Sequence, residues 1–457
     1  MTETDKTLTA QPRTEKDSLG EVLIPAGALY GIQSFRAKNN FPDLGQTVNF
    51  NLIKAIIQIK KAAAVTLAEL VPDKAQVFRA VAAGADEILA GQWREMFIVP
   101  AIQGGAGTST NMNCNEVLAN LALDRLGLPL GSYATCHPLD DVNRGQSTND
   151  VYPTALRIAA IALLRDLSQA AANLQEALQE KENEFAKVFK LGRTELMDAV
   201  PVTLGEEFGA YAQALARDRW RLYKMEERLR EINLGGEAVG LTDRSNKLFR
   251  FGVVEKLRQY TGMGLAAAEY PMDITQNNDV FVEVSGLLRA MAVNLKKISG
   301  DLRLMNSGPY GGLGEIRLAP QQMGSTIMPG KVNPVIPEMV ICAAFKVMAN
   351  DLALTMAAGE GEFELNAFVP VIAESLLESF ELLIKATNLF RVKAIQTVTA
   401  APERCQELLA GSLAKAAGFA PILGYDRVSQ IIANHPQNPA EALSELDAAI
   451  KAQEPQP

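Results

Sequence analysis

Residues 324–334 read Gly-Ser-Thr-Ile-Met-Pro-Gly-Lys-Val-Asn-Pro. The two glycines of this stretch allow backbone conformations that other residues resist, and its two prolines prevent a regular helix or strand. The stretch therefore predicts a loop. A helix should follow it, because Pro337 suits a first helical turn and Glu338 suits the positive end of a helix dipole.

The polar side chains of this loop suit a negatively charged ligand. Lys331 supplies a cation and Asn333 an amide, and both groups bind carboxylates well. Ser325 and Thr326 add two hydroxyls and free backbone N–H groups. Loops with a purely structural role before a helix have a similar composition, so these residues alone leave a structural and a ligand-binding interpretation open.

The composition favours helices and excludes some classes of partner. A chain of 457 residues can bury a large core, and its length allows about two to four domains. Hydrophobic residues make up 48% and charged residues 21% of the chain, which is typical of a soluble globular protein. Aromatic residues are scarce at 6%, which favours helices over sheets. The formal net charge of -9 argues against a nucleic-acid partner, so an anionic substrate would need a local positive pocket.

The sequence gives no indication of export, membrane insertion or a metal site. Its first residues lack the apolar segment of a signal peptide, and no charge-free apolar run approaches the length that crosses a bilayer. Its four cysteines are scattered without Cys-x-x-Cys spacing, so neither a zinc site nor a disulfide framework is expected. We therefore expect a cytoplasmic protein, since a reducing compartment suits such cysteines.

Long helices are predicted in the middle of the chain. Apolar residues recur every three or four positions over residues 163–178 and 222–232. Further helical stretches are expected at about 53–71, 278–305, 337–358 and 363–397. Because glycine and proline are confined to the ends of these stretches, they predict a bundle of long helices, whereas no fixed sequence period supports a helical repeat.

The predicted domain organisation follows chain order. A mainly helical N-terminal domain is expected at residues 1–145, the long-helix bundle with the loop at 146–397, and a small helical domain at 398–457. Residues 1–20 should form a loosely attached tail.

Two further polar clusters lie far from the loop in the chain. Residues 103–109 match neither a dinucleotide-binding nor a Walker pattern, so they form either a simple tight turn or a turn that approaches a ligand, with Thr108 and Ser109 as donors. Residues 137–150 end in Ser147-Thr148-Asn149 just before a long apolar helix. They form either a solvated loop with a helix cap or an anion site at the start of that helix.

The loop at 324–334 closely resembles the signature of the aspartase/fumarase superfamily, usually Gly-Ser-Ser-Ile-Met-Pro-(Gly/Ala)-Lys-Val-Asn-Pro, with Thr326 as the one conservative change. Residues 103–116 resemble the first conserved segment of this superfamily, and residues 147–150 and 192–201 resemble its second. The similarity extends from about residue 12 to about residue 425. The segments that favour the aspartate ammonia-lyase branch are 115–120, 334–338, 345–347 and 350–351.

This resemblance implies an all-α, three-domain fold of the aspartase/fumarase type. The central domain would contribute five long helices per subunit to the twenty-helix core of a homotetramer. Each active site would be shared, with its conserved segments coming from three subunits. No metal and no organic cofactor is required, although some aspartases are activated by divalent cations.

The implied reaction eliminates ammonia from L-aspartate, or from a close aspartate derivative, to give fumarate. Ser325 would act as the base that removes a C–H proton, and an enediolate intermediate would form. Lys331 and Asn333 match residues that hold a substrate carboxylate, and Glu338 matches an acid behind them. The remaining expected substrate contacts are Thr108, Ser109, Ser147, Thr148, Asn149, Thr194, Glu195 and Thr326.

Several residues depart from the superfamily pattern. Glu195 stands where histidine or glutamine is common, and it either pairs with the ammonium group of the substrate or is a structural acid turned toward an arginine. Tyr310 replaces an arginine, Leu139 an asparagine and Glu237 a threonine. The added carboxylates would fit a larger or N-substituted aspartate.

Three alternative functions remain. A fumarate hydratase is disfavoured because the histidine that would stand at position 195 is absent. A lyase that acts on another fumarate-forming amine is closer to the leading interpretation. A non-catalytic structural relative is disfavoured because Ser325, Lys331 and Asn333 are intact.

Overall fold

The computed structural model describes residues 11–241 and 247–452, and within them the chain is mainly helical, as predicted. The shorter helices of the N-terminal part are α2 (Ile32–Asn40), α3 (Phe50–Leu70), α4 (Ala75–Leu89) and α5 (Thr108–Arg125). The long helices are α6 (Thr148–Glu184), α7 (Leu204–Leu229), α10 (Asp279–Met305), α11 (Val335–Ala358) and α12 (Val369–Phe390). The remaining helices are α8 (Lys247–Thr261), α9 (Pro271–Gln276), α13 (Pro402–Ala410), α14 (Ala420–Leu423), α15 (Tyr425–Asn434) and α16 (Pro439–Lys451).

In the described residues, four small two-stranded sheets accompany the helices, and the all-α prediction did not include them. Three are antiparallel: β1 (Arg13–Asp17) with β2 (Gly20–Ile24), β3 (Phe189–Thr194) with β4 (Met197–Thr203), and β7 (Ile316–Arg317) with β8 (Thr399–Ala400). The fourth pairs β5 (Glu231–Ile232) with β6 (Ala266–Ala267) in parallel. These sheets contain too few residues to change the fold class.

The chain separates into two compact units, each built from three segments. The first unit contains Met1–Leu167, Arg221–Arg289 and Lys346–Leu382, and the second contains Ser168–Trp220, Ala290–Phe345 and Leu383–Pro457. The boundaries fall within the five long helices. The three-domain division by chain order stays a prediction.

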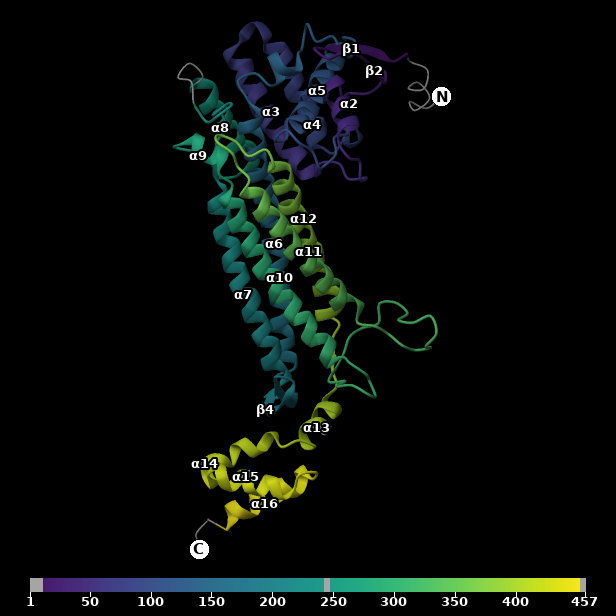
Figure 1. The fold of residues 1–457 in the computed structure, drawn as a ribbon, viewed down its shortest axis with the longest axis vertical. Coiled ribbons are helices and arrows are strands. Elements are labelled where there is room, and N and C mark those ends of the chain that lie inside the picture. The colour runs from purple at the N-terminus through teal and green to yellow at the C-terminus, as the bar shows by residue number, and fades with distance from the viewer. Residues whose placement is uncertain (1–10, 242–246, 453–457) are drawn as a thin grey trace. The chain divides into compact units, whose positions relative to one another are not determined.

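The core of the first unit is formed by α3, α4, α5 and α8 (Figure 1). Helix α3 begins after Asn49, whose side chain accepts a hydrogen bond from the N–H of Asn51 and caps the helix. Its inner face buries isoleucine and alanine side chains, including Ile56 and Ile57. Helix α4 approaches α5 closely, because a side chain at Gly84 would lie 2.9 Å from the Cβ of Leu121.

The long helices confirm most of the predicted stretches. The stretch 222–232 is helical only to Leu229, since Ile232 lies in β5, and the stretch 363–397 becomes helical only at Val369. Helix α10 spans Asp279–Met305 where 278–305 was expected, and α11 spans Val335–Ala358 where 337–358 was expected. Figure 1 shows α6, α7, α10, α11 and α12 running alongside one another. Ion pairs and hydrogen bonds link neighbouring helices, such as Arg289 with Asp351 in the first unit and Tyr211 with Asp301 in the second.

Helix α11 exposes much of its apolar surface. Three of its side chains, Phe345, Leu352 and Met356, are 53%, 62% and 65% exposed. Within the described part of the chain it alone is long and apolar enough to cross a membrane, which by itself is weak evidence for a membrane segment. An exposed apolar face on a long helix is typical of a surface that another protein chain covers.

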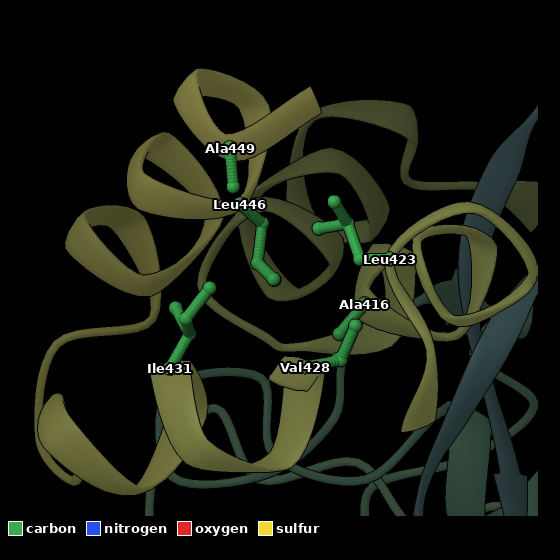
Figure 2. Packing of buried hydrophobic residues seen from close by; sticks show 6 residues of the cluster. All are labelled: Ala416, Leu423, Val428, Ile431, Leu446 and Ala449. Carbon is green, nitrogen blue, oxygen red and sulfur yellow. The ribbon is translucent and has the colours of Figure 1, made fainter. Parts of the chain in front are cut away.

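The start of the described chain is more ordered than predicted, whereas helices were expected near its other end. The expectation of a loose tail over residues 1–20 is wrong for residues 13–20, because β1 pairs with β2 and Arg36 forms an ion pair of 2.9 Å with Asp17; residues 1–10 lie outside the described part. Near the other end, α14, α15, α16 and the preceding 3₁₀ helix (Ala414–Gly418) bury a small apolar cluster of their own (Figure 2). This cluster consists of Ala416, Leu423, Val428, Ile431, Leu446 and Ala449.

Candidate active site

The first group of predicted site residues lies at the start of α5, in the first unit. Thr108 and Ser109 occupy the first two helical positions, and no side chain caps this end. Helix starts leave backbone N–H groups without helical partners, and these groups attract anions. The helix follows Gly107, whose φ of 85° favours glycine, and a side chain there would collide with the ring of Tyr152. The chain can therefore present Thr108 in this way only with glycine before it.

The start of α6 lies beside the start of α5. The amide Nδ2 of Asn111 donates to the Oγ1 of Thr148 over 3.1 Å and so joins the two helix starts. Because the Thr148 oxygen accepts this bond, its hydroxyl proton is available for another acceptor. Ser147 caps the helix, since its Oγ accepts from the N–H of Asn149. The first unit thus contains all five site residues predicted at the two helix starts: Thr108, Ser109, Ser147, Thr148 and Asn149.

Two buried charged groups lie behind this helix start. Asp150 is fully buried and accepts hydrogen bonds from the N–H groups of Ser147, Gly235 and Glu237. Burial raises the pKa of Asp150 to about 7. Lys60 is also fully buried and donates to the Oδ1 of Asn143 over 2.7 Å. Burial lowers the pKa of Lys60 to about 7.

The second group of predicted residues lies in the second unit, on the loop at 324–334. The Oγ of Ser325 accepts hydrogen bonds from the N–H groups of Ile327 at 3.2 Å and Met328 at 2.9 Å. Two backbone donors aimed at one hydroxyl oxygen stabilise negative charge on that oxygen. The loop around it is exposed, with Met323 at 89% and Ile327 at 84%. Thr326 is exposed on the same loop.

The base of the loop is closed by short contacts. The N–H of Gly324 donates to the carbonyl of Lys331 over 2.9 Å, and the Nδ2 of Asn333 donates to the carbonyl of Gly324 over 2.9 Å. A side chain at Gly324 would lie 2.5 Å from the Lys331 carbonyl oxygen, so only glycine fits. One N–H of the Asn333 amide is therefore used inside the loop, which leaves its second N–H and its oxygen for a ligand.

A cavity of about 560 Å³ lies beside this base, within the second unit. Lys331 and Asn333 line it, and so does Glu338, which forms an ion pair of 3.5 Å with Arg303. Its other charged lining residues are Arg317 and Lys393. The lining therefore carries more positive than negative groups, which supplies the local positive field that an anionic substrate needs in an acidic protein.

Thr194 and Glu195 lie at the tip of the β3–β4 hairpin, also in the second unit. Thr194 pairs with Met197, so Glu195 and Leu196 form a two-residue turn, with φ values of 53° and 65°. This geometry is that of a tight hairpin turn in which glycine or asparagine is preferred. Each non-glycine residue in it costs about 1–2 kcal/mol. Such strain commonly marks a functional segment.

Arg193, two residues before Glu195, is already paired. Arg193 donates to the Oε1 of Glu315 over 2.8 Å, and Lys190 lies 3.2 Å from the other oxygen of the same carboxylate. Glu315 has no exposed surface. Within residues 11–241 and 247–452, Glu195 forms no ion pair. The structural interpretation of Glu195, an acid turned toward an arginine, therefore finds no partner in this part of the chain.

The remaining polar residues that the sequence singled out are placed as follows. His137 uses its Nδ1 to accept from the N–H groups of Leu139 and Asp140, so its ring caps a helical turn. Leu139 is 49% and Tyr310 97% exposed.

No group of three or more His, Cys, Asp or Glu side chains in the described segments could hold a metal ion. Burial raises the pKa of the Cys114 and Cys136 thiols to about 12.

Sequence patterns alone did not reveal several residues that build these groups. Asn111 and Asp150 were within quoted motifs, but their contacts with Thr148 and with Gly235 join segments far apart in the chain. Glu315 carried no local signal, because its partners Lys190 and Arg193 lie more than a hundred residues before it. A buried acid of this kind could have been sought by asking which group neutralises the arginine in Gly192-Arg193-Thr194.

The comparisons with known proteins place this helical fold in a family of lyases. Residues 20–349 match the family model described as lyase, and the chain belongs to this family and to the aspartase/fumarase superfamily. The chain is an enzyme of the carbon–nitrogen lyase class. Its similarity to individual members covers nearly its whole length.

Three similar proteins illustrate this relationship. Aspartate ammonia-lyase from Bacillus sp. is 42% identical over 419 residues, which cover 92% of this chain and 90% of that protein. A crystal structure of fumarate lyase:delta crystallin from Brucella melitensis is 43% identical with a TM-score of 0.88, covering 94% of this chain and 99% of that one. Recombinant class II fumarase from Schistosoma mansoni is 30% identical with a TM-score of 0.89, covering 96% of both chains.

Proposed function

We propose that this enzyme eliminates ammonia from L-aspartate, or from a close aspartate derivative, to give fumarate. Several relatives that are 41–44% identical carry the name aspartate ammonia-lyase. The observation that carries the proposal is the pair of N–H groups, from Ile327 and Met328, that donate to the Oγ of Ser325. A serine hydroxyl is a poor base unless its alkoxide is stabilised, and these donors supply that stabilisation.

In the proposed mechanism Ser325 removes a proton from the β-carbon of aspartate. This carbon lies next to the α-carbon, which bears the amino group, and it carries the side-chain carboxylate. The electron pair of the broken C–H bond spreads into this carboxylate as an enediolate, which Lys331 neutralises. The pair then returns to form the carbon–carbon double bond, and ammonia leaves with the electrons of the C–N bond. The exposed loop would close over the bound substrate and exclude water.

Residues of the first unit, together with Thr194 of the second, supply the remaining contacts in this proposal. Thr108, Ser109 and the starts of α5 and α6 offer N–H and hydroxyl donors to a carboxylate. Thr148 has a proton to donate, because its oxygen already accepts from Asn111. Thr194 and Asn149 would bind the carboxylates and the leaving group.

Glu195 favours an amine as the leaving group. A carboxylate without an ion pair of its own attracts an ammonium group, and it would repel a hydroxyl-bearing dicarboxylate such as malate more than a histidine would. This disfavours fumarate hydratase. The same exposed acid, with Glu237 on the segment beside Asn149, favours a second candidate, a lyase for N-substituted aspartates.

The exposed apolar face of α11 supports a homotetramer with shared active sites. Phe345, Leu352 and Met356 would be buried against long helices of other subunits, which would also bring site residues of different protomers together. The division into domains at 1–145, 146–397 and 398–457, the cytoplasmic location and the lack of a cofactor belong to the same proposal. A non-catalytic structural role is less well supported, because Ser325 keeps its two N–H donors.

The direct test follows the ultraviolet absorbance of fumarate with four substrates in turn: L-aspartate, malate, argininosuccinate and an N-alkylated aspartate. We expect fumarate from aspartate or from an N-substituted aspartate. Fumarate from malate alone would replace the proposal by a hydratase. A purified tetramer that yields no fumarate from any of them would support the structural role.

A further inference from the structure

A proline within the first turns of α6 removes one main-chain hydrogen bond next to the candidate site. Pro153 lies inside the helix and has no N–H group. In a regular helix the N–H of residue 153 would donate to the carbonyl of Asn149, four positions earlier. The side chain of Asn233 supplies a donor instead, from its Nδ2 to the Asn149 carbonyl oxygen over 3.0 Å.

The orientation of Asn233 is fully determined by its partners. Its second N–H donates to the Oγ1 of Thr275 over 2.8 Å, and its Oδ1 accepts from the hydroxyl of Thr154 over 3.2 Å. Asn233 has no exposed surface. Because both donors and the oxygen are engaged, the amide cannot turn over without breaking all three bonds.

The segment that carries Asn233 also holds the side chain of Asn149. The Nδ2 of Asn149 donates to the carbonyl of Ala238 over 2.7 Å. The buried carboxylate of Asp150 accepts from the N–H groups of Gly235 and Glu237 and keeps this segment against the helix start. Asn149 is thus held at its main chain by Asn233 and at its side chain by Ala238. This leaves one N–H and the oxygen of its amide for a ligand.

We propose that Asn233 is a positioning residue for substrate binding, which replaces the missing N–H of residue 153 and thereby fixes the amide of Asn149 toward the substrate. The proposal rests on the proposed function, in which Asn149 contacts the substrate. Pro153 and Asn233 act as a pair. The proline leaves the Asn149 carbonyl without its helical donor, and Asn233 donates to this carbonyl and so links its own segment to the start of α6.

The first test replaces Asn233 by alanine and compares the variant with Asn366→Ala. Asn366 is also fully buried and donates to a main-chain carbonyl, that of Ala357, but it belongs to neither group of site residues. We expect Asn233→Ala to raise the KM for the amine substrate by about tenfold or more, because a small displacement of a contacting group has such effects. Asn366→Ala should lower the thermal midpoint with a change of KM below about twofold. Equal KM changes in the two variants would overturn the proposal.

The second test uses a double-mutant cycle with Pro153→Ala. An alanine at position 153 has an N–H that can donate to the Asn149 carbonyl, so it can replace the bond that Asn233→Ala removes. We expect Asn233→Ala to change the KM and the thermal midpoint less in the Pro153→Ala background than in the wild type. The effects of the two substitutions should therefore not add. Additive effects on KM would contradict the link between these two residues.

Two controls keep the result interpretable. If Asn233→Ala does not give a folded tetramer, Thr275→Val is the second variant: it removes the acceptor of the second N–H of Asn233, together with the bond from the Thr275 hydroxyl to the Pro271 carbonyl. A KM increase without loss of the tetramer would then support the proposal, and an unchanged KM would overturn it. Wild-type enzyme without turnover of any aspartate derivative would refute the proposed function itself. Wild-type turnover with an unchanged KM in Asn233→Ala would refute only the role of Asn233.

Discussion

Arg193 donates to the fully buried carboxylate of Glu315 over 2.8 Å, although 122 positions separate the two residues in the chain. This pair explains how Glu195, two residues further along the hairpin, remains without an ion pair in the described part of the chain. The hairpin therefore presents an acid whose charge no neighbouring arginine neutralises. Its effect on the reaction can be measured separately from its effect on folding.

We expect Glu195→Gln to raise the KM for an amine substrate by about five- to tenfold, because a neutral amide attracts an ammonium group less than a carboxylate does. The thermal midpoint should change little, since Glu195 is exposed. Steady-state kinetics of fumarate formation measure the effect, with Glu403→Gln, another exposed glutamate, as the matched control. An unchanged KM would show that Glu195 does not contribute to binding of the amine substrate.

Glu315→Gln should destabilise the protein by about 3–5 kcal/mol, because it leaves Arg193 without its buried counter-ion and Lys190 with only its ion pair to Glu207. Urea unfolding at one fixed protein concentration measures this loss. The control is Lys16→Met, which breaks the exposed pair with Glu21 and should cost at most about 1 kcal/mol. Similar losses in the two variants would mean that the buried ion pair contributes no more to the free energy of unfolding than the exposed one.

Ser325→Ala should lower kcat by about 10²–10⁴-fold, the usual contribution of a general base. The oligomeric state and the thermal midpoint should not change, because the serine lies on an exposed loop. Met323→Ala, on the same loop with a side chain that is 89% exposed, tests whether any change in this loop has the same effect. Turnover by Ser325→Ala within a few-fold of the wild type would exclude the serine as the base.

Gly107→Ala and Gly105→Ala separate backbone strain from crowding. Both glycines have positive φ, at 85° and 83°, but a side chain at position 107 meets Tyr152 whereas one at position 105 meets no atom within 4 Å. We expect a loss of about 1–2 kcal/mol for Gly105→Ala. Gly107→Ala should lose about 1–3 kcal/mol more. Thermal midpoints of the two variants give the difference, and equal losses would show that Tyr152 yields without cost.

The stability of the protein should depend on pH through Asp150. Burial raises the pKa of Asp150 from 3.8 to about 7, so between these values the folded state keeps a proton that the unfolded state has lost. This contribution therefore falls as pH rises from about 4 to about 7. Lys60, whose pKa burial lowers from 10.5 to about 7, is protonated in both states over most of this range.

Asp150→Asn cannot ionise, so its free energy of unfolding should fall less between pH 4 and pH 7 than that of the wild type. It should also be less stable at pH 4 by about 1–3 kcal/mol, since an amide accepts fewer of the three N–H bonds. The exposed Asp426→Asn is the control and should leave the pH dependence unchanged. Identical pH dependence in wild type and Asp150→Asn would contradict the raised pKa.

The sequence predicts the helices well and the contacts between segments poorly. Spacing of apolar residues located α10 and α11 to within a few residues, because helical periodicity is a local property. The β3–β4 hairpin was missed, since its turn uses Glu195-Leu196 rather than the glycine or asparagine that such turns prefer. The resemblance identified candidate site residues, but the groups behind them, such as Glu315 and Asn233, depend on pairings across 80 or more positions.

The strained turn at Glu195 and Leu196 has a consequence for how this enzyme can diversify. Its shape is held by the pairing of β3 with β4 and by the ion pair between Arg193 and the buried Glu315. The side chain of Glu195 therefore contributes little to the stability of the fold. Substitutions at this turn should therefore cost little stability, and under the proposed function they could change the preferred leaving group without any change in Ser325 or its loop.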